Sequence, residues 1–123
     1  MAPTLGNGKI CYIFMSSDDV QKSAEFYKKV FGWNVRTRGD GSVSFDDGVG
    51  EVSGTWQKGL KPYDGGAMVV YIMVEDAEAT IEKIKAAGGE IVQPIGGDPG
   101  EITARFRDPG GNVVAIYEQP NEG

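Results

Sequence analysis

The residues of this chain that could carry out chemistry are few, and their types limit the reactions available. The 123 residues include no histidine and a single cysteine, Cys11. A histidine-based triad, a histidine general base and a histidine-ligated metal site are therefore excluded. Among the carboxylates, Glu51 is the candidate general base. It could move a proton near neutral pH if burial raised its pKa.

Side chains that could bind a ligand alternate with others along the predicted strands, and alternate strand residues face opposite sides of a sheet. If Tyr12 faces a binding site, the same parity brings further residues to that face. The candidate ligand-binding residues are Tyr12, Phe14, Ser53, Tyr71, Met73, Arg105, Ala115 and Tyr117. Such a face is aromatic and apolar with a few polar groups. It suits an apolar or aromatic ligand that carries a polar or anionic group.

The same residues also have simpler interpretations. The aromatic side chains would then fill the interior, and Arg105 would be a solvated strand charge. Glu51 would be a surface carboxylate at the start of a strand. Cys11 has the opposite parity to Tyr12, which predicts a buried and inert thiol.

The elements that must position these residues follow from hydrophobic periodicity. Residues 9–15 form a nearly continuous apolar run, which predicts a strand buried on both faces. Residues 20–31 carry apolar side chains at helical spacing, with Asp18 as the expected N-cap and Gly32 at the end of the helix. The remaining strands of this half are expected at 33–38, 42–45 and 51–57.

The same order of elements begins again after a glycine-rich break at 58–66. An apolar strand at 68–74 precedes a helix that Asp76 caps and Gly88–Gly89 ends. Residues 11–15 match 70–74, at an offset of about 59 residues, which indicates an internal repeat. The last three strands are expected at 90–93, 101–107 and 112–118.

The pattern of strand, helix and three strands, written twice, predicts an α+β fold in one domain spanning 1–123. The first module covers about 8–57, the linker 58–66 and the second module about 67–119. One module alone would leave a face of its sheet uncovered. Two modules can curl their sheets into a half-barrel cup with the helices outside, which is a natural site for a small molecule.

Two motifs add a family resemblance. The first is Phe26–Tyr27 followed by Phe31–Gly32–Trp33, and the second runs from Phe106 to Asn112 as FRDPGGN. With the double repeat, they resemble the vicinal oxygen chelate superfamily, which groups glyoxalase I, bleomycin-resistance proteins and extradiol dioxygenases. The resemblance covers residues of about 8–119. These motifs imply the fold, because they pack a helix against a sheet or build a turn, and they say little about chemistry.

The resemblance also implies where a metal would lie. Enzymes of this superfamily hold a divalent ion in the cup, with ligands from the first and last strands of each module. Those positions fall on Tyr12, Glu51, Val69 and Ala115 in this chain. Only Glu51 has a ligand type, and one carboxylate cannot supply a catalytic ligand set. We therefore expect neither a metal nor another cofactor.

Composition restricts the partners. The net charge of −6 argues against a nucleic-acid surface, and no apolar run is long enough for a membrane span. The first residues lack the charged and apolar regions of a signal peptide, and a single cysteine fits a reducing compartment, so a cytoplasmic location is expected. The resemblance further implies a homodimer.

Three functions fit the sequence. The first is metal-independent binding of an apolar or aromatic small molecule, as in the drug-sequestering members of the superfamily. The second is a metal-free lyase- or isomerase-like enzyme with Glu51 as the base. The third is a non-catalytic structural or partner-binding module whose cup is filled by its own side chains. The absence of histidine favours the first.

Overall fold

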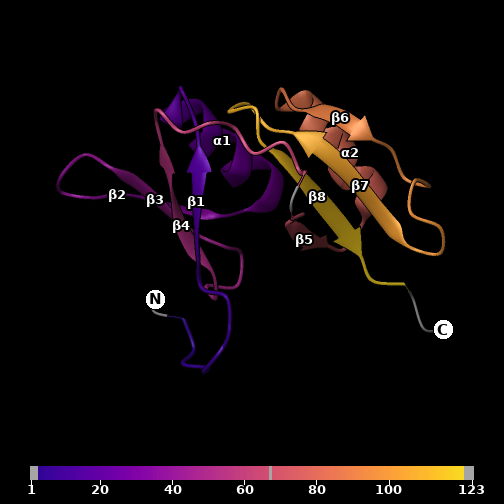
Figure 1. Ribbon diagram of the computed structural model, residues 1–123, viewed down its shortest axis with the longest axis horizontal. Coiled ribbons are helices and arrows are strands. Elements are labelled where there is room, and N and C mark those ends of the chain that lie inside the picture. The colour runs from indigo at the N-terminus through magenta and orange to yellow at the C-terminus, as the bar shows by residue number, and fades with distance from the viewer. Residues whose placement is uncertain (1–2, 67, 121–123) are drawn as a thin grey trace.

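The computed structural model describes residues 3–66 and 68–120 and confirms the predicted α+β fold. Two four-stranded sheets each carry one helix (Figure 1). The first sheet has the spatial order β1 (Tyr12–Ser16), β4 (Ser53–Gln57), β3 (Val43–Asp46) and β2 (Asn34–Thr37). The second repeats that order as β5 (Tyr71–Val74), β8 (Val113–Glu118), β7 (Ile102–Arg107) and β6 (Glu90–Gln93). The helices are α1 (Val20–Phe31) and α2 (Ala77–Ala86).

Each sheet mixes parallel and antiparallel pairs in the same way. The first strand of each repeat runs parallel to the last, β1 to β4 and β5 to β8, and the other pairs are antiparallel. Within the described ranges the two sheets are not joined to each other, so β1 and β5 are edge strands with one neighbour each. An open pair of sheets of this kind is consistent with the predicted cup.

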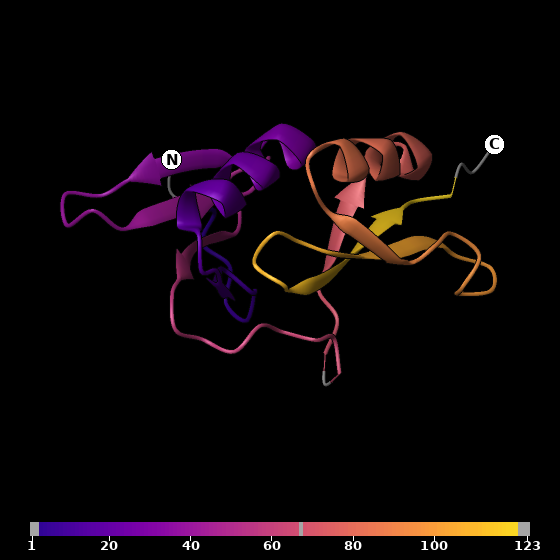
Figure 2. The same cartoon turned by 90° about the horizontal axis from the view of Figure 1, so that it is seen from above.

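The two helices cover the same side of the molecule. Figure 2 shows α1 and α2 next to each other above the sheets, and residues of the two helices are in contact. The linker passes on the opposite side, and no helix covers the sheets there (Figure 2). We call these uncovered sides the open faces. Within the described part of the chain, no helix is long and apolar enough to cross a membrane.

Helix α1 begins one residue later than the sequence predicted. The N-cap is Asp19, not Asp18, because Asp19 has extended backbone angles and its side chain accepts from the backbone N–H of Lys22 at 3.1 Å. The end of the helix is as predicted. Gly32 has a φ of 70°, a left-handed conformation that a residue without Cβ adopts at little cost.

An aromatic core lies between the helices and the covered faces of the sheets. Tyr27 of α1 stacks on Trp33 with 4.5 Å between ring centroids, and Trp33 stacks on Phe45 of β3 at the same distance. Phe26 extends this core to Phe106 of β7, 5.8 Å away. The core therefore runs without a break from one repeat into the other.

Hydrogen bonds join the two motifs that carry the family resemblance. The Tyr27 hydroxyl donates to Asp108 Oδ2 at 2.7 Å, and both side chains are buried. Asn112 Nδ2 donates to the carbonyl of Ser16 at 2.7 Å, and its Oδ1 accepts from the backbone N–H of Tyr63 at 3.0 Å. The turn between β7 and β8 thus holds α1, the end of β1 and the linker together.

Strand β1 corrects two expectations. It begins at Tyr12 rather than at residue 9, and it is not buried on both faces along its length, since Phe14 is 61% exposed. Cys11 was expected to be buried, but it is exposed. The physical reason is its position, because Cys11 precedes the strand in an N-terminal segment that extends away from the helices (Figure 1).

Candidate functional site

Two rows of side chains cross the open faces at equivalent positions in the two repeats. The first row follows the strand pairing through Tyr12, Ser53, Asp46 and Asn34. The second follows it through Tyr71, Ala115, Arg105 and Gln93. Both rows start with a tyrosine and end with an amide. Their third members have opposite charge, so we call them the Asp46 row and the Arg105 row.

Asp46 is fully paired within its own sheet. Its oxygens accept from Arg36 Nε at 3.0 Å and Nη2 at 2.9 Å, and from Ser53 Oγ at 2.7 Å. The amide of Asn34 adds a longer bond of 3.4 Å. These donors, Arg36 first, lower the pKa of Asp46 to about 2. The carboxylate is thus ionised and neutralised at neutral pH.

Arg105 is the opposite case. Its side chain is half-buried, and the buried Nε has no hydrogen-bond partner. Among residues 3–66 and 68–120, no carboxylate forms an ion pair with it. Burying a donor without an acceptor costs free energy, and the cost is larger for a charged group. Arg105 is therefore poised to accept a partner that the chain itself does not supply.

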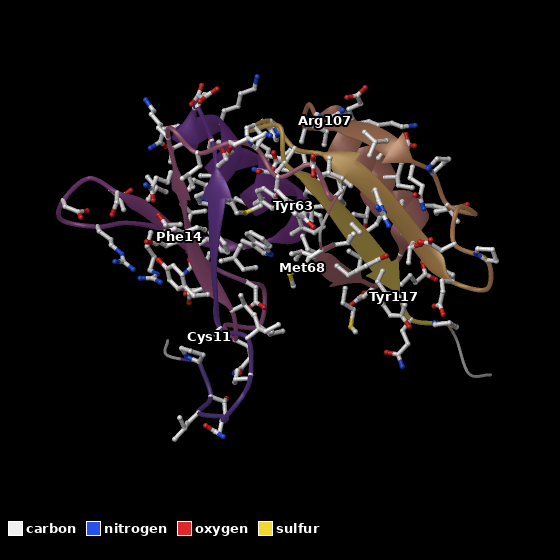
Figure 3. The ribbon with its side chains drawn as sticks, in the orientation of Figure 1. Cys11, Phe14, Tyr63, Met68, Arg107 and Tyr117 are labelled. Atoms are coloured by element: carbon white, nitrogen blue, oxygen red, sulfur yellow. The ribbon has the colours of Figure 1, made fainter. Side chains whose placement is uncertain are left out.

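Large apolar side chains are exposed where the helices do not cover the strands. The exposed fractions are 42% for Tyr12, 61% for Phe14, 45% for Tyr71 and 68% for Met73. Tyr12 and Phe14 meet edge to face with ring centroids 5.6 Å apart. Figure 3 shows Phe14 over the first sheet and Met68, which follows the linker, between the two sheets. Exposed apolar side chains that lie together, as Tyr12 and Phe14 do, indicate a binding surface.

A pocket of about 290 Å³ lies on the open face of the first sheet. Tyr12 and Phe14 form its apolar wall, and Arg38 is a further lining residue. Ser44 also lines it, and the buried Ser44 Oγ has no hydrogen-bond partner. A larger depression of about 530 Å³ lies beside the N-terminus of α1 and contains none of the predicted site residues.

Glu51 lies apart from these features. It precedes β4, forms an ion pair with Lys9 and accepts from Thr4 Oγ1 at 2.9 Å. The Lys9 ammonium and Thr4 lower the pKa of Glu51. A general base at this position was expected to need a raised pKa, so the environment found is the reverse of the one expected. The donors Lys9 and Thr4 belong to the N-terminal segment, far from Glu51 in sequence.

The other predicted site residues differ in how accessible they are. Ser53 is half-buried and is engaged with Asp46, and Tyr117 is half-buried. Ala115 is fully buried, so its side chain is not free to contact a ligand. Arg107, on the same face as Arg105, pairs with Glu90 at 2.9 Å.

The residues at the implied metal positions do not fit a divalent ion. Glu51 is bound to Lys9, and Ala115 has no donor atom. Strand pairing also places Tyr71, rather than Val69, at the position equivalent to Tyr12. In the described ranges, no three or more His, Cys, Asp or Glu side chains gather into a group that could hold a metal. The donor set is thus unlike that of a catalytic metal site.

Asp46 and Asn34, the other two members of the Asp46 row, were not among the predicted site residues. Asp46 and Ser44 alternate with the buried Val43 and Phe45, all within β3. This alternation is the signal of a strand with one polar face. The predicted strand ended at Phe45, one residue too early to include Asp46.

The fold and the open faces define a class of small α+β proteins with two tandem repeats and an uncovered sheet surface. The sequence model of the Glyoxalase/Bleomycin resistance protein/Dioxygenase superfamily matches residues 9–116. The chain belongs to this superfamily. The resemblance found in the two motifs is thereby confirmed.

Named relatives and solved structures agree with this assignment. A probable lactoylglutathione lyase of Vibrio parahaemolyticus is 30% identical over 128 residues, with 93% of each chain covered. An anthracycline biosynthesis protein of Streptomyces peucetius is 25% identical over 91% of this chain and 47% of its own length. A solved structure of a possible glyoxalase from Bacillus cereus has a TM-score of 0.69 at 23% identity, covering 89% of this chain and 98% of that chain. A hypothetical protein from S. aureus reaches 0.74 at 19% identity, over 91% and 94%. These two structures support the fold alone.

Proposed function

We propose that the protein binds an apolar or aromatic small molecule on its open faces, without a metal. The observation that carries the proposal is the exposure of Tyr12, Phe14, Tyr71 and Met73, each inside a regular strand. Water contact with such side chains is unfavourable, by about 25 cal/mol for each Å² of apolar surface. A ligand that covers them removes this surface from water.

The pocket beside Tyr12 and Phe14 supports binding over a site filled by the protein's own side chains. Its volume of about 290 Å³ is open to solvent, and Ser44 Oγ offers an unpartnered polar atom in its lining. Ligand sites commonly combine an apolar wall with a few polar groups that fix orientation. A self-filled module would instead bury these aromatic rings.

Some relatives carry the name lactoylglutathione lyase, so the environment of Glu51 is compared with the one that a general base requires. A metal-free enzyme of the kind considered from the sequence would use Glu51 as its base. The ion pair with Lys9 and the lowered pKa of Glu51 make that carboxylate a weaker proton acceptor. These contacts favour binding over proton transfer at Glu51.

We further propose that the protein works as a cytoplasmic homodimer. Among residues 3–66 and 68–120, no second strand pairs with the edge strands β1 and β5, and unpaired edges invite pairing with another chain. Light scattering at micromolar concentration is expected to give twice the 13.2 kDa of one chain, and a value of one chain would refute the dimer. The unpaired thiol Cys11 is compatible with a reducing compartment.

The ligand site is tested by removing one apolar side chain from the open face. Isothermal titration with 2-naphthamide, a neutral aromatic probe, is expected to show saturable binding that Phe14→Ser weakens at least about fivefold. Val49→Ser is the matched control, because Val49 is 78% exposed but lies between β3 and β4, outside both strands. Equal affinity of the Phe14 and Val49 variants, or no binding by the unmodified protein, would refute the site.

A further inference from the structure

We propose that Arg105 binds a carboxylate group of the ligand, so that the anionic end of the ligand lies on the second sheet. This proposal rests on the proposed function, because it names the chemistry of the same open faces. The sequence allowed a polar or anionic group anywhere on the predicted face. The structure distinguishes the two rows and assigns the anion to one of them.

The guanidinium group of Arg105 has a donor that the described part of the chain leaves without an acceptor. Arg105 Nε is buried from solvent and has no acceptor among residues 3–66 and 68–120. The donor is therefore unsatisfied in this conformation, and a ligand oxygen reaches it once the partly exposed side chain turns toward the open face. A charged donor of this kind gains more from an acceptor than a neutral one does.

The carboxylates of Glu90, on strand β6, and Asp98, in the loop between β6 and β7, already have other partners. Glu90 is the one carboxylate within β6, and it binds Arg107 at 2.9 Å. Asp98 accepts from Thr103 Oγ1 on β7. The cross-strand partners of Arg105 are Ala115, which has no polar side-chain atom, and Gln93, which does not hydrogen-bond to it. The sheet thus offers Arg105 no anion of its own.

The Asp46 row and the Arg105 row differ in charge at their third position. At the position equivalent to Arg105, the first sheet carries Asp46, and Arg36 neutralises it from the adjacent strand. A ligand carboxylate near Asp46 would meet a second negative charge, which is unfavourable. Near Arg105 it would meet an unpaired positive charge. The two rows therefore differ in their preference for an anion at this one position, while the exposed Arg38 of the first open face also forms no ion pair among the described residues.

The geometry of a guanidinium group favours a carboxylate. Nε and one Nη point in the same direction, and together they match the two oxygens of a carboxylate in a side-on, bidentate pair. One unpaired arginine balances one negative charge. The net charge of −6 on the chain disfavours more highly charged anions.

Two probes of nearly equal shape separate the charge from the aromatic contact. 2-Naphthoate carries a carboxylate, and 2-naphthamide carries a neutral amide in the same position. The unmodified protein is expected to bind the naphthoate more tightly than the naphthamide. Arg105→Gln is expected to weaken naphthoate binding at least about tenfold and to leave naphthamide binding within about twofold. Arg105→Lys keeps the positive charge but lacks the two parallel N–H donors of a guanidinium group, so an intermediate loss of naphthoate affinity is expected.

Arg107→Gln is the matched control, because Arg107 lies on the same strand but is already paired with Glu90. It is expected to leave the affinity for both probes unchanged. Thermal unfolding of each variant verifies that it folds, and the Nε–H resonance of Arg105 gives a readout in the unmodified protein. That resonance is expected to shift on adding naphthoate and not on adding naphthamide.

The outcomes are distinguishable from those of the proposed function. If naphthamide binds but Arg105→Gln leaves naphthoate binding unchanged, the carboxylate site is wrong while binding on the open faces stands. If Arg107→Gln causes the same loss as Arg105→Gln, the effect is general electrostatics and the assignment to Arg105 is also wrong. If neither probe binds, both proposals fail together.

Discussion

Single residues on the open faces differ chiefly in whether their charge is paired. Asp46 has an arginine, a serine and an asparagine around it, whereas Arg105 has no acceptor for its buried Nε. Glu51, whose type made it the candidate base, is held by Lys9 and Thr4. The chemistry available to each residue thus depends on partners that lie elsewhere in the sequence.

The pairing of Asp46 predicts a specific pH dependence. Its pKa is about 2 in the folded protein and near 3.8 in an unfolded chain, so the stabilisation is present above about pH 4 and is lost as the pH falls toward 2. Urea unfolding measured at pH 4 and at pH 2 gives the free energy of unfolding at each pH. The decrease in this free energy between the two pH values is expected to be smaller for Asp46→Asn than for the unmodified protein. Asp18→Asn, which removes an exposed carboxylate, is the control and should keep the full loss.

If the free energy of unfolding decreased equally with falling pH in the Asp46 variant and in the unmodified protein, this assignment would be contradicted. Asp108 cannot produce the predicted loss, because burial raises its pKa. A raised pKa means that protonation favours the folded state, which is the opposite sign.

At the scale of the elements, the order and approximate bounds of all ten helices and strands followed from periodicity and turn residues. Residues 90–93 were predicted without error, and most other ends moved by one to three residues. The exposure of Phe14 could not be predicted in this way, because an apolar run does not say whether another element covers it. The same limit applies to Cys11 and to the partners of Glu51, which depend on contacts distant in sequence.

The N-cap of α1 offers a test at this scale with a control in the adjacent residue. Asp19 accepts from the backbone N–H of Lys22, whereas Asp18 makes no such bond among the described residues. Asp19→Ala is expected to lower the free energy of unfolding by about 0.5–2 kcal/mol. Asp18→Ala should leave it nearly unchanged in the same denaturant titration. The reverse order would show that the cap lies at Asp18 after all.

At the scale of the whole molecule, two equivalent repeats share one core and carry Asp46 and Arg105 at equivalent positions of their open faces. Family motifs that looked purely local connect the repeats, since Tyr27 of α1 donates to Asp108 in the turn between β7 and β8. The repeat could be predicted from the sequence. Strand parity also predicted that Tyr12 and Phe14 share one face of their strand, and it placed Tyr71 and Arg105 on the corresponding face of the second repeat. It could not reveal that Arg105 is unpaired and Asp46 paired, because both properties depend on neighbouring strands.

The contact between the repeats predicts a large effect from one hydroxyl group. Tyr27→Phe removes a donor from the buried Asp108 and is expected to lower the free energy of unfolding by about 1–3 kcal/mol. Tyr12→Phe is the matched control, since Tyr12 is 42% exposed and its change should stay within about 0.5 kcal/mol. Chemical unfolding at neutral pH measures both. Equal effects would mean that the hydrogen bond across the repeats contributes nothing specific.

Binding on the open faces is the central claim, and a nuclear magnetic resonance titration with 2-naphthamide tests it most directly. We predict saturable shifts at the backbone amides of β1, β3 and β4 around the pocket beside Phe14, with α1 and α2 unchanged. Shifts at residues 18–21 instead would place binding in the larger depression beside α1. That result, or the absence of any saturable shift, would contradict the account.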